Sequence, residues 1–475
     1  MKAPHLTLLD AMNDANLFGS WFCNPSSWTA WRAFIAALFG LPMTDEQLTI
    51  YRQCTERTRP LSVASAEAWL ICGRRAGKSF VLALIAVFLA CFHDFRRYLT
   101  RGERATIMVI ATDRRQARVI VRYIRGLITG TPMLASLIER ETADGLDLNN
   151  AVTIEIGTAS HRTTRGYTIA AALCDELAYW PAEDSATPDY EILDAVRPGM
   201  GTIPNAMLLC ASSPYARRGA LFDAYRRYYG RDDAPVLIWK AATRTMNPTF
   251  RQSIIDAAIE RDPAAAAAEY GAEFRTDVDS YIARDVVEAA IDPGIYERPP
   301  IAGVQYSAFV DPSGGACDAM TCAVAHRENR VLTLDAIRER RPPFSPECVV
   351  AEFDALLKRY HVGTIEGDRY GGEWPREAFS RHGITYRVAT RTRSDLYRDL
   401  LPELNSRNVA LLDSPRLVAQ LCGLERRTSR GGRDIIDHAP GSHDDIANAV
   451  AGALVMAIRR ERFPVQMETG LPIFG

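Results

Sequence analysis

Residues 72–79 read C-G-R-R-A-G-K-S and form most of a phosphate-binding loop. In the usual pattern, G-x-x-x-x-G-K-[ST], backbone N–H groups surround the phosphates, the lysine reaches the β- and γ-phosphates, and the hydroxyl binds Mg²⁺. Lys78 and Ser79 hold the last two places here, whereas Cys72 stands in place of the first glycine, so we expect Gly73 to supply the turn. The loop predicts a nucleoside triphosphate site with Mg²⁺, whose nucleotide-binding residues are Gly73, Arg74, Arg75, Ala76, Gly77, Lys78 and Ser79.

Two adjacent acids, Asp175 and Glu176, end an apolar run that begins at Thr168. In a nucleotide-hydrolysing site, an acid at a strand end ligates or orients the magnesium ion, and its neighbour polarises the attacking water. We assign the metal role, together with Ser79, to Asp175 and the water-activating role to Glu176. Each motif strengthens the interpretation of the other, because acids of this kind are expected downstream of a phosphate-binding loop in an α/β pattern.

Other polar residues could also act on the phosphates. Ser212 and Ser213 follow the apolar run 206–211 and either sense the γ-phosphate or form a plain turn. Arg165 lies in Thr164-Arg-Gly-Tyr167, before the acidic run. This arginine and the two loop arginines either stabilise charge in the transition state or are solvated surface residues.

A second set of acids lies in the C-terminal part of the chain. Asp311 closes the run Ala308-Phe-Val-Asp, Asp368 closes Thr364-Ile-Glu-Gly-Asp, and Asp444 and Asp445 open the last helical pattern. Carboxylates brought together by a sheet can hold two divalent ions that act on a phosphodiester, either Mg²⁺ or Mn²⁺ since all ligands are oxygens. Either Asp444 or Asp445 could be the third ligand, with Asp445 preferred and the other capping the helix, and Asp318 could be an auxiliary ligand or a turn residue.

The elements that must position these acids follow from the hydrophobic pattern. Apolar strand-like runs alternate with longer helical stretches from about residue 66 to 275, which predicts an α/β domain with a mainly parallel sheet. The predicted strands are 68–71, 105–111, 152–157, 169–174 and 206–211, and the predicted helices include 80–92, 113–127 and 255–274. A second α/β block has predicted strands at 306–310, 320–326, 330–337 and 364–367 and a final helix at 446–460.

These patterns divide the chain into five segments. We expect a helical N-terminal lead-in at 1–60, a P-loop ATPase domain at 61–277, a linker at 278–300, a nuclease domain at 301–460 and a flexible tail at 461–475.

Composition excludes several classes of protein. The net charge of −2 neither supports nor excludes nucleic acid as a partner, although all but four of the 56 basic residues are arginines, which suit bidentate phosphate contacts. Ten cysteines without a C-x-x-C pair indicate reduced core residues rather than zinc ligands or disulfides. We find no signal-peptide pattern and no apolar run that could span a bilayer, so we expect a cytosolic protein.

The order of the motifs resembles the large terminase subunit of tailed bacteriophages. The matching motifs, over about residues 45–460, are GRRAGKS, RGYT before ALCDE, CASSPY, EYGAEF, FVDPSGG, EGDRYGG and HDDIANAVA. The resemblance implies a P-loop ASCE-type ATPase domain, followed by an RNase H-like nuclease domain. Asn448 departs from the pattern, since many relatives carry another aspartate there, and this suggests that the metal set ends at Asp445.

By this resemblance, Lys78, Ser79, Asp175 and Glu176 carry ATP hydrolysis with Mg²⁺, and Arg165 matches an arginine that reaches a neighbouring subunit's nucleotide. Asp311, Asp368 and the Asp444/Asp445 pair match the metal ligands of the nuclease. The family packages double-stranded DNA into a procapsid. The implied partners are therefore DNA, the portal protein, the small terminase subunit and further copies in a ring on the procapsid, in the host cytoplasm.

Basic clusters of the C-terminal half are candidates for phosphate contact, or else solvated basic faces. They are Arg338 to Arg341, Arg391, Arg393 and the run from Arg426 to Arg433. A helicase-nuclease or DNA-repair ATPase is the alternative function; it would share the loop and the acidic strand but should carry a second ATPase-like lobe. A structural subunit with a decayed ATP site would have lost Lys78 or Glu176, and both are present.

Overall fold

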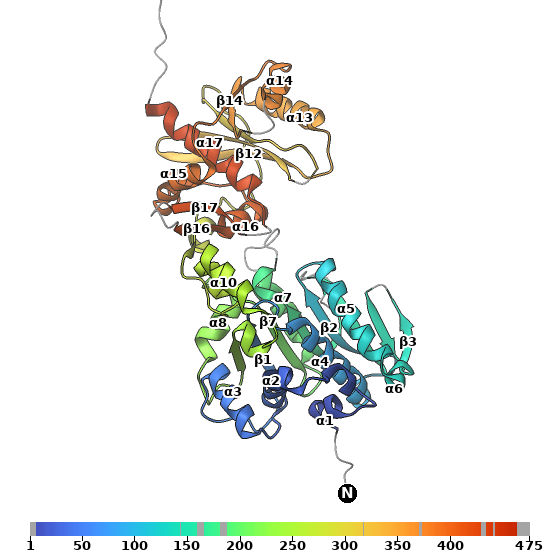
Figure 1. The fold of residues 1–475 in the computed structure, drawn as a ribbon. Helices are drawn as coiled ribbons and strands as arrows, with labels where there is room; N and C mark the ends of the chain where they lie inside the picture. Colours follow the sequence, from blue (N-terminus) through green and yellow to red (C-terminus); the bar gives the residue numbers. More distant parts are fainter. Residues whose placement is uncertain are drawn as a thin grey trace, which may run out of the picture. The chain divides into compact units, whose positions relative to one another are not determined.

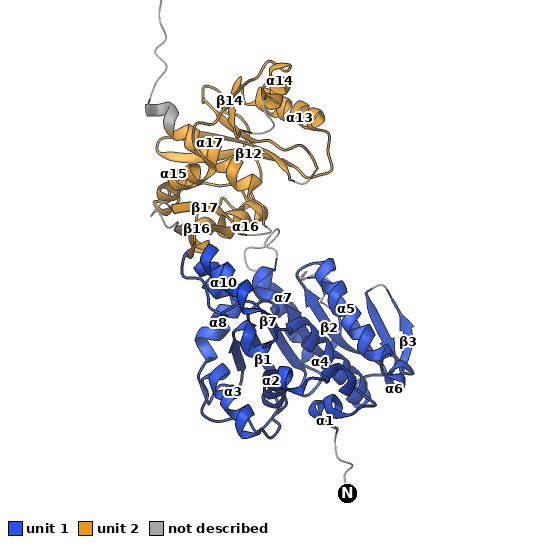
Figure 2. Cartoon of the chain, viewed as in Figure 1, with its two compact units in different colours: residues 1–181, 187–277 blue, residues 182–186, 278–475 orange. Residues whose placement is uncertain are grey.

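The computed structural model describes residues 6–142, 144–158, 166–180, 188–316, 318–369, 373–428, 434–439 and 442–462. The chain divides into two compact units, residues 1–181 with 187–277 and residues 182–186 with 278–475 (Figure 2). Each unit has its own sheets and core, and each is described by itself. Among the described residues, no helix has the length and apolar character needed to cross a membrane.

Unit 1 is built on a sheet in the order β3-β4-β5-β2-β6-β7-β1-β8. Within this order, the six neighbouring strands β5, β2, β6, β7, β1 and β8 pair in parallel. Strands β3 and β4 extend the sheet beyond β5 with antiparallel pairing. Strand β7 lies between β1, which leads into the 72–79 loop, and β6, which ends in Asp175; this additional strand is the ASCE-type arrangement, as predicted. The strands are β1 Glu67–Cys72, β2 Ala105–Ala111, β3 Ile138–Glu141, β4 Gly145–Leu148, β5 Val152–Thr158, β6 Thr168–Asp175, β7 Met207–Ser212 and β8 Leu237–Ala241.

Helices cover both faces of this sheet (Figure 1). Alternate residues of β1 face opposite sides, so Leu70 joins the core formed with α2, α4 and α5, while Trp69 and Ile71 join the core formed with α7 and α8. The helices are α1 Leu8–Asn13, α2 Thr29–Phe39, α3 Asp45–Thr55, α4 Lys78–Phe92, α5 Arg114–Thr129, α6 Pro132–Ala135, α7 Pro188–Val196, α8 Gly219–Tyr228, α9 Thr243–Met246, α10 Gln252–Arg261 and α11 Pro263–Glu269.

The helix predicted over 255–274 was wrong in its extent. The structure has two helices there, α10 and α11, and residues 270–274 follow them without helical structure. Asp262 ends the first helix and caps the second by accepting a hydrogen bond from the N–H of Ala265 at 3.1 Å. Pro263 cannot donate a backbone hydrogen bond to the preceding turn, so the alanine-rich run is broken at this point.

Unit 2 contains a sheet in the order β14-β13-β10-β11-β12-β15. Strands β10, β11 and β12 form an antiparallel meander, and β13 and β14 add in parallel on the other side of β10. The predicted second α/β block and its RNase H-like arrangement are thus confirmed. The strands are β10 Ser307–Asp311, β11 Met320–Glu328, β12 Val331–Arg340, β13 Thr364–Gly367, β14 Thr385–Val388 and β15 Val409–Ala410.

Helices of unit 2 also pack on both faces of its sheet. Phe309 faces the core that contains α15 and α17, whereas Val310 faces the core that contains α13. The helices are α12 Arg284–Glu288, α13 Pro346–Arg359, α14 Trp374–Ser380, α15 Arg393–Asn405, α16 Pro415–Gly423 and α17 Asp445–Arg462.

A small antiparallel sheet in the order β17-β16-β9 completes unit 2. Its strands are β9 Val278–Ser280, β16 Leu424–Thr428 and β17 Asp434–His438. The segment 278–300, which we expected to be a linker, contains β9 and α12. Tyr281 and Val287 of this segment are buried in the core of unit 2.

Candidate nucleotide and metal sites

The 72–79 loop lies between the end of β1 and the start of α4 in unit 1. Its turn is made by Arg75 (φ 65°) and by Gly77 (φ 104°), which occupies the N-cap position of α4. The carbonyl of Ala76 accepts a hydrogen bond of 3.0 Å from Nε1 of Trp31, which is buried. The loop therefore leads into the N-terminus of α4, a geometry that favours anions.

Gly73 is needed for close approach rather than for the turn, which corrects our expectation. It does not have a left-handed backbone, but a Cβ atom here would lie 2.3 Å from Oγ1 of Thr243 and 2.7 Å from the carbonyl oxygen of Tyr270. The Gly73 N–H also donates to the carbonyl of Ala241 at 3.1 Å. The buried Cys72 in the preceding place is uncharged, since burial raises the pKa of its thiol.

Lys78 is buried, and its ammonium group is surrounded by acceptors. Nζ donates to the carbonyls of Cys72 and Gly73 at 3.1 and 3.4 Å and to Oγ of Ser213 at 2.9 Å. It also forms an ion pair with Oε1 of Glu176 at 3.3 Å. The loop lysine and the acid that we predicted to activate water therefore lie in direct contact.

Asp175, at the end of β6, faces the first turn of α4. Its Oδ2 accepts a hydrogen bond of 2.9 Å from Oγ of Ser79, and its Oδ1 is buried without a hydrogen-bond partner among the described residues. Burial, and next the charge of Glu176, raise the pKa of Asp175 to about 7. A buried carboxylate oxygen left unpaired beside a hydroxyl is what a hard divalent cation requires.

Glu176 has a left-handed backbone (φ 50°), and its side chain turns toward the end of β7. Its Oε2 accepts from the N–H of Ser213 at 3.1 Å and from Oγ of Ser212 at 3.3 Å. The two serines thus contact Lys78 and Glu176, which joins the ends of β1, β6 and β7 in one polar network.

The loop arginines differ in their surroundings, although both are exposed. Nη1 of Arg74 pairs with Glu269 at 3.2 Å, and the carbonyl of Arg74 accepts from Oγ1 of Thr243 at 2.8 Å. The carbonyl of Arg75 accepts from Nδ2 of Asn247 at 3.0 Å. Arg165 lies outside the described residues.

Sequence reasoning missed these supports of the loop. Thr243 and Asn247 lie in and after α9, and Trp31 lies on α2. Only Glu269 stood in a motif that we singled out, and no role was given to it.

In unit 2, Asp311 and Asp368 are joined by one amide. Asp311 ends β10, Asp368 directly follows β13, and Asn448 is the fourth residue of α17. Nδ2 of Asn448 donates to Oδ2 of Asp311 at 3.0 Å and to Oδ2 of Asp368 at 2.8 Å. Asn448 is fully buried, and its Oδ1 has no hydrogen-bond partner among the described residues. Burial and the facing carboxylate raise the pKa of Asp311 well above its usual range, and burial raises that of Asp368.

Asp444 and Asp445 have different environments. Asp444 is buried, and its two oxygens accept from Nη1 of Arg393 at 2.7 Å and from the hydroxyl of Tyr397 at 2.8 Å. Asp445 begins α17, and burial, followed by the charge of Asp444, raises its pKa to about 6. The charges of Asp445 and Asp444 both add to the upward shift of the pKa of Asp311.

Asp318 lies apart from that set of contacts. It is exposed, and its Oδ1 lies 3.7 Å from Nδ1 of His443. Asn448, the departure from which we inferred that the metal set ends at Asp445, contacts both Asp311 and Asp368. The departure from the aspartate pattern was visible in the sequence, but the position of the amide was not.

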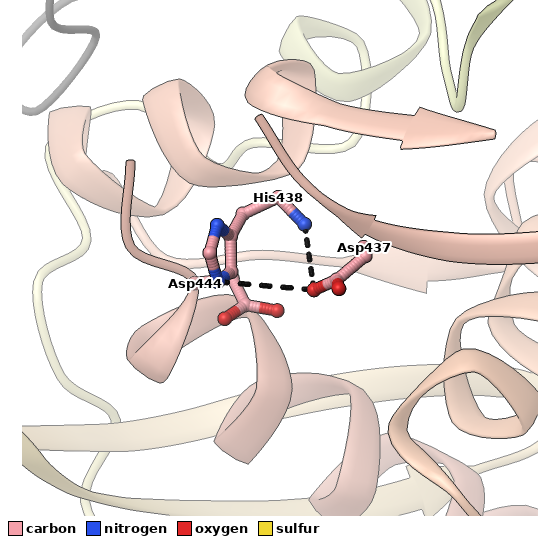
Figure 3. Close-up of side chains that lie close together, drawn as sticks. All are labelled: Asp437, His438 and Asp444. Atoms are coloured by element: carbon pink, nitrogen blue, oxygen red, sulfur yellow. Dashed lines mark hydrogen bonds and ion pairs between the residues drawn. The ribbon is translucent and has the colours of Figure 1, made fainter. Parts of the chain in front are cut away.

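A further group of possible metal ligands consists of Asp437, His438 and Asp444 (Figure 3). The Nδ1 atom of His438 lies 3.0 Å from the carbonyl of Ala439, and Nε2 lies 3.8 Å from Oδ1 of Asp437. Arg393 already pairs with Asp444 and lies 3.9 Å from Oδ1 of Asp437. Because the positive charge of this guanidinium offsets the negative charges of Asp437 and Asp444, we interpret the group as an ion-pair network.

The basic clusters predicted to touch DNA are largely paired with acids. Arg338 pairs with Glu297 at 2.6 Å, Arg427 with Glu425 at 2.9 Å and Arg341 with Glu339 at 3.8 Å. Arg340, Arg391 and Arg426 pair with Glu352, Asp399 and Asp434. Arg430 and Arg433 lie outside the described residues. The net charge of these clusters is therefore smaller than the sequence suggested.

No family model and no curated protein matches the chain. Among solved structures, the large terminase of bacteriophage HK97 is 16% identical with a TM-score of 0.39, over 90% of this chain and 99% of that one. A large terminase from a thermophilic bacteriophage is 11% identical with a TM-score of 0.38, over 91% and 99%. The magnesium-bound large terminase nuclease of thermophilic phage G20c is 16% identical with a TM-score of 0.33, over 37% and 97%. These three solved structures are large terminases, or the nuclease of one, from bacteriophages.

Proposed function

We propose that the chain is a large terminase subunit that couples ATP hydrolysis to the movement of double-stranded DNA into a procapsid and cuts concatemeric DNA with a two-metal nuclease. One observation carries the proposal, namely that a single chain holds two different sites suited to phosphate chemistry. The first joins the 72–79 loop to Asp175 and Glu176, and the second joins Asp311, Asp368 and Asn448.

The first site fits ATP with Mg²⁺. Lys78 and the loop N–H groups would hold the phosphates, and Ser79 with the unpaired Oδ1 of Asp175 would hold the cation. When bound, Mg²⁺ offsets the charge that develops on the phosphates during transfer.

The contact between Lys78 and Glu176 means that a triphosphate must bind to Lys78 before Glu176 can act on water. While Glu176 is paired with the ammonium group, its Oε1 interacts with that cation. A triphosphate brings negative charge to Lys78 and competes for that ammonium group, which releases Glu176 to orient the attacking water and accept its proton. The hydrogen bonds from Ser212 and Ser213 keep the released carboxylate at the end of the sheet.

The second site fits divalent cations bound by oxygen ligands. Asp311 and Asp368 are carboxylates with raised pKa values and no direct cationic partner among the described residues, and the free Oδ1 of Asn448 is a further oxygen beside them. Bound Mg²⁺ or Mn²⁺ would stabilise the attacking and leaving oxygens of a phosphodiester. We assign Asp445 as the third carboxylate, and Asp444 to positioning through Arg393 and Tyr397.

The proposed partners follow from the same function. Double-stranded DNA is the substrate, the portal protein and small terminase subunit are the docking partners, and further copies of the chain form a ring in which Arg165 reaches the next subunit's nucleotide. The place of action is the host cytoplasm, at the procapsid portal.

Two measurements on the full-length chain test the two halves. ATP hydrolysis with and without duplex DNA is compared for the wild type and Glu176→Ala, and plasmid cleavage in Mn²⁺ is compared for the wild type and Asp368→Ala. Normal hydrolysis by Glu176→Ala would refute the motor assignment. Linearisation of plasmid by Asp368→Ala would refute the nuclease assignment.

A further inference from the structure

Helix α5 of unit 1 presents a row of exposed arginines. Arg115, Arg118 and Arg122 are all exposed. At 100° per residue, their spacing of three and four residues places them within one narrow stripe along the helix. We name these three residues the α5 stripe.

The α5 stripe lacks neutralising partners. Helix α5 contains no acidic residue, and none of the three arginines forms an ion pair with another described residue. In this respect it differs from the clusters of unit 2, where arginines such as Arg338 and Arg427 are paired with acids. An unpaired row of guanidinium groups leaves a positive potential that attracts a polyanion.

The position of the stripe ties it to the nucleotide site. Strands β1, β2, β6 and β7 run parallel, so the ends of β1, β6 and β7 that carry the 72–79 loop, Asp175 and Ser212 share an edge with the end of β2. Helix α5 starts directly after β2, where Oδ1 of Asp113 accepts hydrogen bonds from the N–H groups of Arg115 and Gln116. The stripe therefore begins at the same edge of the sheet as the loop.

Helix α5 also packs against the helix that follows the loop. The ring of Tyr123 meets that of Phe80 edge to face, with centroids 5.5 Å apart, and Phe80 directly follows Ser79. A displacement of the first turn of α4 on nucleotide binding would therefore be transmitted to the helix that carries the stripe.

We propose that the α5 stripe binds the phosphate backbone of double-stranded DNA in a way that does not depend on base sequence. From Arg115 to Arg122 the helix rises about 10 Å, which matches roughly three base-pair steps along one strand. Phosphates along a strand form such a row, and arginine contacts to them position a duplex without reading it. The inference rests on the proposed function, because it names the surface that grips the DNA moved by the ATPase.

The test measures binding of a fluorescent 30-base-pair duplex of arbitrary sequence to the full-length chain, across a range of salt concentrations and without divalent ions to prevent cleavage. The triple variant Arg115→Gln, Arg118→Gln, Arg122→Gln should bind at least about tenfold more weakly at 0.1 M salt, with a salt slope reduced by about 2.7, or 0.9 for each lost phosphate contact. Glutamine has a helix propensity similar to that of arginine, so α5 should stay folded.

Two further variants serve as controls. A triple lysine variant at the same positions keeps the charge and should retain most of the affinity. Arg52→Gln, Arg101→Gln, Arg231→Gln removes the same charge from exposed arginines on other elements of unit 1 and should bind DNA nearly as the wild type does.

The outcomes separate this inference from the proposed function. If the wild type neither binds duplex DNA nor hydrolyses ATP, the proposed function fails. If the wild type binds and the glutamine triple binds equally well, the inference alone is overturned, as it also is if the two glutamine triples lose affinity equally. If the lysine triple loses as much affinity as the glutamine triple, positive charge at these positions is not what binds the duplex, which also overturns the inference.

Discussion

The two candidate sites place acids at strand ends in the same way, but they balance the charge of those acids differently. In unit 1, Glu176 pairs with the ammonium group of Lys78 at 3.3 Å. In unit 2, among the residues that the structure describes, the group that joins Asp311 and Asp368 is the neutral amide of Asn448. The first site therefore carries its own counter-charge, whereas the second relies on protons or on cations from solution.

This difference suggests how each site is kept inactive without its ligand. In unit 1, Glu176, the proposed catalytic acid, is paired with Lys78, the residue proposed to hold phosphate. In unit 2 the carboxyl groups have raised pKa values, so at low pH they are neutral, and they become ligands when a cation offsets the cost of ionising them.

The largest effect is expected from the substitution that breaks the ion pair between Lys78 and Glu176 in unit 1. Glu176→Gln should lower ATP hydrolysis by about 10²- to 10⁴-fold, because the amide cannot accept a proton from water. ATP binding should persist, since Lys78 is then free for phosphate. Steady-state phosphate release and nucleotide binding measure the two effects.

Glu273→Gln is the matched control for this change. Glu273 also pairs with a lysine of unit 1, Lys240, at 2.7 Å, but it lies outside the described phosphate network. It should leave hydrolysis near the wild-type rate. Equal losses in both variants would show that the effect comes from breaking an ion pair and not from a lost base.

The second prediction adds a charge to unit 2. Asn448→Asp replaces the buried bridging amide by a carboxylate beside those of Asp311 and Asp368 and should lower the free energy of unfolding by about 1–3 kcal/mol in EDTA, through two lost hydrogen bonds and added repulsion. Mn²⁺ should restore the stability, because the extra carboxylate strengthens cation binding. Thermal unfolding with EDTA and with Mn²⁺ checks both arms.

Asn408→Asp provides the comparison within the same unit. Nδ2 of Asn408 donates to Oε2 of Glu403 at 3.1 Å, so the same chemical change again places a carboxylate beside an acid. We expect a smaller loss that Mn²⁺ does not reverse. If Mn²⁺ rescues both variants or neither, then the metal site does not include the position of Asn448.

A third prediction concerns the scaffold that holds Asp311 and Asn448. Gly452 of α17 lies against β10, where an added Cβ would approach the ring of Phe309 to 2.2 Å. Gly452→Ala should destabilise the protein by about 1–3 kcal/mol through overpacking, which outweighs the gain of up to about 1 kcal/mol in helix propensity.

Gly423→Ala is the control that gains helix propensity without overpacking. Gly423 ends α16, and no atom lies within 4 Å of a Cβ built there. The same substitution should therefore be neutral or stabilising in a denaturant melt. A stabilising Gly452→Ala would show that α17 can move away from β10.

The smallest expected effect is at the support of the 72–79 loop. Thr243→Val removes the hydroxyl that bonds the carbonyl of Arg74 at 2.8 Å while keeping the shape of the side chain. We expect a loss of about 0.5–1.5 kcal/mol in stability and weaker nucleotide binding. Thr49→Val is a comparable change at an exposed bond, from Oγ1 to the carbonyl of Asp45, and should leave nucleotide binding unaltered.

Local patterns in the sequence predicted most of the fold. The strands that carry the loop and the acids are short apolar runs bounded by polar residues, so β1, β6, β7, β10 and β13 were identified directly. The prediction of one helix over 255–274 was wrong because it gave more weight to the alanine content than to the break that Pro263 imposes. The amino-acid composition of a segment does not show that a single proline, which lacks a backbone N–H, interrupts the helix.

Contacts between distant residues could not be predicted in the same way. The bond from Thr243 to Arg74 joins residues 169 positions apart, and nothing local to Thr243 indicates it. The ion pairs of the C-terminal arginines depend on which acids the fold brings near, so the sequence showed the positive charges but not their partners. Asn448 was noticed as a departure, yet its contact with two acids needed the helix to be placed against the sheet.

The hydrogen bond from Trp31 to Ala76 makes the N-terminal helical segment a natural optical probe of the loop. The indole Nε1 lies 3.0 Å from a carbonyl inside the 72–79 loop, and the side chain is only 1% exposed. Any rearrangement of that carbonyl changes the polarity around the indole ring, and with it the wavelength and yield of emission. Replacement of Trp31 by Phe should then remove the part of the intrinsic fluorescence that reports on this carbonyl, and the remaining response would come from Trp180, whose Nε1 donates to the carbonyl of Asp175 at 3.0 Å. The loop of unit 1 can thus be followed without an added label.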